Sequence, residues 1–136
     1  MRLLLDTHVV LWVLGGHPRL TSRDRAMLTD NVEAYVSVAS WWELAIKQSR
    51  GLHTLTEPVA ALRAAALDAG MRELTIAAGP AMRVADLPLL HRDPFDRMLI
   101  AQALEEPMRL VTADSVVASY AQACGVLISR VSGERS

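Results

Sequence analysis

The feature that most constrains the fold is the alternation of short apolar runs with longer segments of helical character. The apolar runs are typical of β-strands, which we expect at residues 2–5, 33–38, 72–76, 110–112 and 126–131. Strands that alternate with helices pair as parallel neighbours, because each pair then has room for a crossover connection. The sequence therefore predicts an α/β fold, with a central parallel sheet and helices on both faces.

The segments between these runs predict helices at residues 8–14, 21–30, 41–50, 59–69, 77–87, 94–105 and 115–123. A chain of 136 residues is long enough for one domain, which we place at residues 1–131. The polar stretch 132–136 is expected to be a disordered tail.

Composition excludes several classes of protein. Hydrophobic residues make up 51% and charged residues 21% of the chain, which excludes a disordered protein. Aromatic residues make up only 4%, so a platform for stacking nucleic-acid bases is not expected. The single cysteine, Cys124, excludes an internal disulfide and fits a reducing cytoplasm. No apolar run is long enough to span a membrane, and Asp6 interrupts the opening MRLLL before a signal peptide can form.

Four acidic residues stand where a predicted strand ends or a predicted helix begins. These are Asp6, Glu43, Asp96 and Asp114, and Asp93 is a fifth acid beside them. Ligands of parallel sheets bind outside the carboxyl ends of the strands, so these positions are the ones to examine for function.

Each of these acids also has a structural interpretation. Ser40 and Glu43 have the spacing of a capping box, and Asp93 and Asp114 precede helices as N-cap residues do. Asp6 is harder to explain in this way, because it ends the strand that we expect to be the most buried.

Taken together, the acids indicate a metal site. Asp96 precedes Leu99 and Ile100 by three and four residues, so its side chain is expected to point toward the sheet. Carboxylates that converge there would repel one another by about 4 kcal/mol per pair at 4 Å, unless protons or cations intervene. Oxygen ligands favour Mg²⁺ or Mn²⁺, and such ions act on water and phosphate oxygens. The pattern therefore suggests phosphodiester hydrolysis.

Four segments of the chain resemble the PIN-domain ribonucleases, and in particular the VapC-type toxins of bacterial toxin-antitoxin pairs. They are LLLDTHVVLW (3–12), VSVASWWELAIK (36–47), HRDPFDRMLIAQAL (91–104) and LVTAD (110–114). The resemblance implies a metal-dependent endoribonuclease that cleaves RNA, held by a cognate antitoxin in a type II pair, and a homodimer.

The resemblance also implies roles for individual residues. Asp6, Glu43, Asp96 and Asp114 are expected to form the catalytic and metal-binding site, with Mg²⁺ or Mn²⁺ as the ion. Thr7, Ser40 and Thr112 match positions that support the acids, and Asp93 is expected to be a capping or outer group.

Other residues near the motifs have less specific interpretations. His8 and His91 are expected to pack or form hydrogen bonds rather than bind metal. Trp41 and Trp42 point to different sides of a helix, so one is expected in the core and the other toward a partner. Four basic residues could meet an RNA backbone or be ordinary surface: Lys47, Arg50, Arg92 and Arg97.

Three alternatives remain at this stage. A receiver-type signalling domain also gathers acids at strand ends, but it needs a lysine after a late strand, and the only lysine is Lys47. A haloacid-dehalogenase-like phosphatase needs a second Asp two residues after Asp6, where this chain has His8. A non-catalytic PIN-like module that binds RNA or protein is the third.

Overall fold

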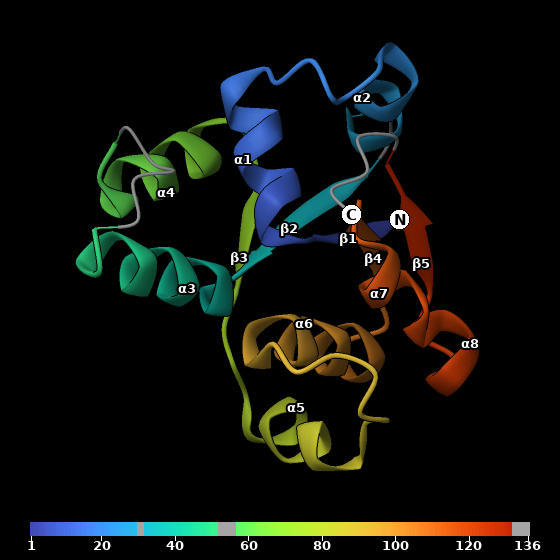
Figure 1. Cartoon of the computed structure of the whole chain (residues 1–136). Coiled ribbons are helices and arrows are strands. Elements are labelled where there is room, and N and C mark those ends of the chain that lie inside the picture. Colours follow the sequence, from blue (N-terminus) through green and yellow to red (C-terminus); the bar gives the residue numbers. More distant parts are fainter. Residues whose placement is uncertain (30–31, 52–56, 132–136) are drawn as a thin grey trace.

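A five-stranded parallel sheet forms the centre of the computed structural model, which describes residues 1–29, 32–51 and 57–131 (Figure 1). The strands are β1 (Arg2–Leu5), β2 (Glu33–Ser37), β3 (Arg72–Leu74), β4 (Arg109–Thr112) and β5 (Ile128–Arg130). They lie in the order β3-β2-β1-β4-β5, and all four neighbouring pairs are parallel. The predicted α/β fold with a central parallel sheet is confirmed.

Helices cover both faces of the sheet, so the central strand β1 is buried between two layers of helices. They are α1 (Thr7–Gly15), α2 (Ser22–Thr29), α3 (Val38–Ser49), α4 (Val59–Asp68), α5 (Ala78–Arg83), α6 (Pro94–Glu105), α7 (Ser115–Ala118) and α8 (Tyr120–Cys124), with a 3-10 turn η1 (Val84–Asp86). Leu3 and Leu5 of β1 pack with α1, α2 and α4, whereas Leu4 packs with α6 and α8. Figure 1 shows α1 and α4 on one side of the sheet and α5 and α6 on the other. Successive side chains of β1 thus point to opposite faces of the sheet and pack into two separate hydrophobic cores.

The strand order reverses beside β1, and this reversal positions the site. From β1 the chain runs outward through β2 to β3, and it later returns to the other side of β1 with β4 and then β5. Leu5 pairs with Val36 of β2 and Val111 of β4, each one residue before the end of its strand, so the carboxyl ends of three strands lie side by side. Side chains that directly follow these strands therefore meet at one edge.

Helix α3 begins three residues earlier than predicted. Its N-cap is Ser37, whose hydroxyl accepts a hydrogen bond from the backbone N–H of Ala39 at 3.0 Å. Ser40 therefore lies inside the helix, and Glu43 lies beyond its first turn. The capping-box interpretation of Ser40 and Glu43 is wrong, because the serine nearer the end of β2 caps the helix instead.

Other boundaries differ by a few residues. The predicted helix 115–123 is two short helices, α7 and α8, and the Ser119 hydroxyl donates to the carbonyl of Val116 between them. The predicted helix 77–87 is α5 followed by the tighter turn η1. The expected tail 132–136 lies outside the described residues. None of the described helices is long and apolar enough to cross a membrane.

Candidate metal and catalytic site

Asp6 directly follows β1 and is held by the neighbouring strand β4. Its backbone N–H donates to the carbonyl of Val111 at 2.9 Å, and its Oδ2 accepts a hydrogen bond from the Thr112 hydroxyl at 2.7 Å. Its Oδ1 lies 3.4 Å from the N–H of His8, so Asp6 also caps α1. The side chain is only 2% exposed, and these bonds from two elements fix the direction of its carboxylate.

Asp114 is joined to Asp6 through one shared residue. The Thr112 hydroxyl donates to Asp6 and accepts from the backbone N–H of Asp114 at 3.0 Å. The Asp114 Oδ1 accepts from the backbone N–H groups of Val116 and Val117, at 2.8 and 3.3 Å, and caps α7. The N-cap interpretation of Asp114 is confirmed, and Thr112 links the two acids as a support residue would.

Glu43 enters from α3 as a buried carboxylate, 4% exposed. Its Oε2 accepts an ion-paired hydrogen bond from Lys47 at 3.0 Å. Its Oε1 is buried and has no hydrogen-bond partner among the described residues. A buried oxygen without a partner costs free energy, so this atom is suited to a ligand. Nearby, the hydroxyls of Thr7 and Ser40 are 2.8 Å apart and join α1 to α3.

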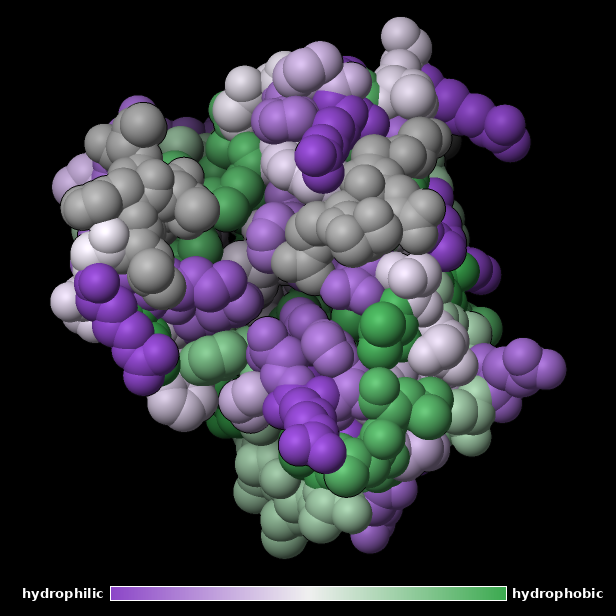
Figure 2. Space-filling view, viewed as in Figure 1, coloured by the Kyte–Doolittle hydropathy of each residue, from purple (hydrophilic) through white to green (hydrophobic). Residues whose placement is uncertain are grey.

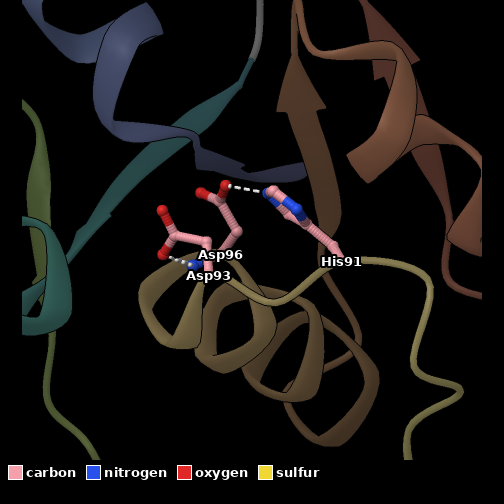
Figure 3. A group of neighbouring side chains, drawn as sticks. All are labelled: His91, Asp93 and Asp96. Carbon is pink, nitrogen blue, oxygen red and sulfur yellow. Dashed lines mark hydrogen bonds and ion pairs between the residues drawn. The ribbon is translucent and has the colours of Figure 1, made fainter.

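Asp96 lies in the first turn of α6 and is 5% exposed, as predicted for an acid that points toward the sheet. Its Oδ2 is 2.7 Å from Nε2 of His91. Asp93 caps the helix by accepting from the N–H groups of Phe95 and Asp96, at 2.8 and 3.2 Å, which confirms its N-cap interpretation. Figure 3 shows the Asp96 carboxylate between the His91 ring and the Asp93 carboxylate. Ligand atoms of these three residues lie within 4.8 Å of one another.

The electrostatics of Asp96 tie these acids together. Burial, and then the negative charges of Asp6, Asp93 and Glu43, raise the pKa of Asp96 from 3.8 to about 7, and the hydrogen bond with His91 opposes this rise. Asp6, Glu43 and Asp96 are therefore within electrostatic reach of one another, and Asp114 is connected to them through Thr112. In Figure 2, hydrophilic residues gather over α3 and over α6, with a depression between them.

Two basic residues have structural roles that the sequence interpretation missed. The Arg97 guanidinium donates to backbone carbonyls that include Val84 and Pro88, each at 3.0 Å, so it supports a loop rather than facing RNA. Lys47 pairs with Glu43. His91 forms a hydrogen bond, as expected. Its partner Asp96 lies five positions later in the chain, and no local motif predicts this pairing.

The two tryptophans separate as predicted. Trp41 is 8% exposed and donates through Nε1 to Glu73, whereas Trp42 is 58% exposed. The Trp42 ring meets Phe95 edge-on, with ring centroids 5.2 Å apart. One tryptophan belongs to the core and the other to the surface beside the start of α6.

The sequence profile of the PIN domain matches residues 3–123, a range that contains all four proposed site acids. The chain belongs to the PIN-domain family. Among the relatives of this PIN domain is Ribonuclease VapC22 of Mycobacterium tuberculosis (strain ATCC 25618 / H37Rv), with 31% identity over 118 residues. The alignment covers 86% of this chain and 90% of the relative, which makes this PIN domain a distant homologue of VapC ribonucleases.

Solved structures have the same fold as this PIN domain. One is a toxin-antitoxin complex from Klebsiella pneumoniae, which matches with a TM-score of 0.55 at 17% identity, over 81% of this chain and 84% of that one. VapBC2 from Rickettsia felis, bound to a DNA fragment from its promoter, matches with a TM-score of 0.69 at 16% identity, over 96% of this chain and 99% of that one. VapBC-1 from nontypeable Haemophilus influenzae matches with a TM-score of 0.65 at 17% identity, over 96% and 98%. FitAcB from Neisseria gonorrhoeae matches with a TM-score of 0.62 at 19% identity, over 93% and 95%. At these identities the likeness concerns the fold.

Proposed function

We propose that this PIN domain is a metal-dependent endoribonuclease that hydrolyses RNA phosphodiester bonds, and that it is the toxin of a type II toxin-antitoxin pair. The observation that carries the proposal is the gathering of buried carboxylates around Asp96, each held by its own supporting bonds. The distant homology to a protein named as a VapC ribonuclease supports the choice of RNA.

The residues present fit a hard divalent cation. Asp6, Glu43 and Asp96 offer carboxylate oxygens, and Oε1 of Glu43 is buried without a partner. The raised pKa of Asp96 reflects repulsion that a cation would relieve. An all-oxygen set of ligands favours Mg²⁺, with Mn²⁺ as the alternative, over zinc.

We assign Asp6, Asp96 and Asp114 chiefly to metal binding, and Glu43 to metal or water orientation. Bound Mg²⁺ would neutralise charge on the phosphate and lower the pKa of the attacking water. The Thr112 hydroxyl holds the Asp6 carboxylate in place, and Lys47 holds one oxygen of Glu43 while the other stays free to accept a proton from water. No side chain needs to act as a nucleophile.

Cleavage of a structured RNA pool tests the nuclease proposal. Wild-type protein with Mg²⁺ is expected to cleave, and either chelator or Asp96→Asn is expected to abolish cleavage. Asp68→Asn is a matched control, because Asp68 is an exposed acid at the end of α4. Equal cleavage in all reactions would overturn the metal-nuclease proposal. No cleavage by wild type with any RNA or metal would favour the non-catalytic binding module, and the match to the PIN family leaves a receiver-type domain without support.

We further infer that the antitoxin binds a groove between α1 and α3. The groove has a volume of about 490 Å³ and is lined by Thr7, His8, Leu11, Trp12, His17, Leu44 and Lys47. It reaches the acidic site at Lys47, which pairs with Glu43. A partner segment with an apolar face and an arginine would fill the groove and meet the acids. The toxin-antitoxin complex from Klebsiella pneumoniae that has this fold supports such a partner.

Co-expression with the product of the adjacent upstream reading frame tests this inference. The product is expected to co-purify with the chain and to suppress its growth arrest. Leu11→Glu is expected to weaken the complex, because it places a charge in the groove. Leu127→Glu is the control, since Leu127 is exposed and lies outside the groove. A product that neither binds nor suppresses growth arrest would overturn the toxin proposal.

A further inference from the structure

The loop before α6 is held from inside by one arginine. Arg97, in the second turn of α6, donates through Nη1 to the carbonyls of Pro88 and His91, at 3.0 and 3.4 Å. Its Nη2 donates to the carbonyls of Val84 and Leu87, at 3.0 and 3.4 Å. One side chain therefore binds four carbonyls of a segment that has no strand partner.

A tyrosine from α8 completes the support. Tyr120 is fully buried, and its hydroxyl accepts from the backbone N–H groups of Leu90 and His91, at 3.1 and 2.9 Å. The same hydroxyl donates to the carbonyl of Pro88 at 2.8 Å, and Nη1 of Arg97 lies 3.2 Å from its oxygen. Buried hydrogen bonds of this kind are costly to break, so the path of the loop is well defined.

His91 is consequently fixed on both sides of its Cα atom. Its N–H donates to Tyr120 and its carbonyl accepts from Arg97, which aims the ring toward α6. The ring Nε2 lies 2.7 Å from Oδ2 of Asp96, and the His91 side chain is 23% exposed. Figure 3 shows the second oxygen of Asp96 directed away from the imidazole.

We propose that His91 is a positioning residue, which holds Oδ2 of Asp96 so that Oδ1 is presented to the metal, and that Arg97 and Tyr120 keep His91 in place. A buried carboxylate surrounded by Asp6, Asp93 and Glu43 would otherwise rotate away from its acidic neighbours. Partners that orient a metal-binding side chain in this way commonly affect metal affinity about 10- to 100-fold. The inference rests on the proposed metal-dependent function.

Calorimetric titration with Mn²⁺ tests the role of His91. His91→Ala is expected to weaken Mn²⁺ binding about 10- to 100-fold, whereas His91→Gln, whose amide can donate near the position of Nε2, is expected to stay within about threefold of wild type. In RNA cleavage, His91→Ala is expected to need an about 10- to 100-fold higher Mn²⁺ concentration for half-maximal kcat, and to leave the KM for RNA nearly unchanged. A role limited to folding would lower the melting temperature without this rescue by Gln.

A matched pair of tyrosine variants tests the support of His91. Tyr120→Phe keeps the buried ring and removes the hydroxyl, so the amides of Leu90 and His91 should exchange with solvent about tenfold faster. Mn²⁺ binding should weaken about threefold to tenfold. Tyr35→Phe is the control, because the Tyr35 hydroxyl bonds only to the exposed Glu33 among the described residues, and it should change neither measurement.

The outcomes separate this inference from the proposed function. If wild-type protein binds no Mn²⁺, or if Asp96→Asn binds it equally well, both the metal-dependent function and the positioning role of His91 are overturned. If wild type binds Mn²⁺ and Asp96→Asn does not, but His91→Ala binds as wild type does, only the positioning role is overturned. If Tyr120→Phe leaves both amides protected, the support by Tyr120 is overturned.

Discussion

At the scale of single residues, Asp96 couples charge to stability. Its pKa is raised to about 7 in the folded chain, above the ordinary value of 3.8, so the folded state holds the proton more tightly. Protonation of Asp96 therefore stabilises the folded state. This contribution is complete below about pH 4 and is lost as the pH rises through about 7. Asp96→Asn cannot ionise, so in chelator at pH 8 we expect it to be more stable than wild type by about 1 to 3 kcal/mol. Thermal melts at pH 5 and pH 8 measure the difference.

The exposed acid Asp68 provides the control for these melts. Asp68→Asn should follow the wild-type dependence on pH, and Mg²⁺ should reduce the advantage of Asp96→Asn by binding the folded wild type. If Asp96→Asn melts below wild type in chelator at pH 8, the carboxylates do not repel one another and the shared site is wrong.

Thr112 is the second residue whose effect can be isolated, because its hydroxyl joins Asp6 to the backbone of Asp114. Thr112→Val keeps the shape and removes both bonds, so we expect a loss of about 1 to 2 kcal/mol in stability and a loss of about tenfold or more in RNA cleavage. Urea unfolding and initial cleavage rates measure the two effects. Thr75→Val, at an exposed position, should change neither the stability nor the cleavage rate. If Thr112→Val cleaves RNA as fast as wild type, the Thr112 hydroxyl does not support the site.

At the scale of elements, α6 brings Asp96 to the sheet, and Asp93 determines where that helix begins. Asp93 caps two N–H groups, including that of Asp96 itself. Asp93→Ala is therefore expected to destabilise the chain by about 1 kcal/mol, whereas Asp93→Asn keeps the cap and removes a charge that repels Asp96. In chelator at pH 8, Asp93→Asn should have a higher melting temperature than Asp93→Ala. Its melting temperature should equal or exceed that of wild type. Equal melting of the Ala and Asn variants, which both lack the charge, would mean that the cap contributes nothing.

At the scale of the whole molecule, we expect the exposed Trp42 to lie in the interface of a homodimer. Trp42 and Phe95 meet at the start of α6, where both line a cavity of about 190 Å³. Exposed aromatic residues beside such a cavity commonly contribute to interfaces. We therefore expect a homodimer that Trp42→Ala converts to monomer, as measured by light scattering after gel filtration. Leu127→Ala, at another exposed position, should stay dimeric, and a monomeric wild type would contradict the expectation.

The sequence by itself determined the features that depend on local signals. The apolar run at residues 2–5 identified the central strand, because burial on both faces requires apolar side chains at successive positions. The pair Asp93 and Pro94 placed the start of α6 correctly, since a capping acid followed by proline acts within one turn. The same alternation of strands and helices placed Asp6 and Asp114 at strand ends.

The tertiary structure alone decided what depends on residues far apart in the chain. The hydroxyl of Ser40 is within hydrogen-bond distance of Thr7, 33 positions away, a contact that no local pattern contains. The pKa of Asp96 depends on burial and on charges from β1 and α3, which no local pattern contains. Arg97 looked like surface charge, yet the carbonyls of a folded-back loop surround it. Local patterns specify elements, whereas burial and long-range contacts decide the chemistry of each side chain.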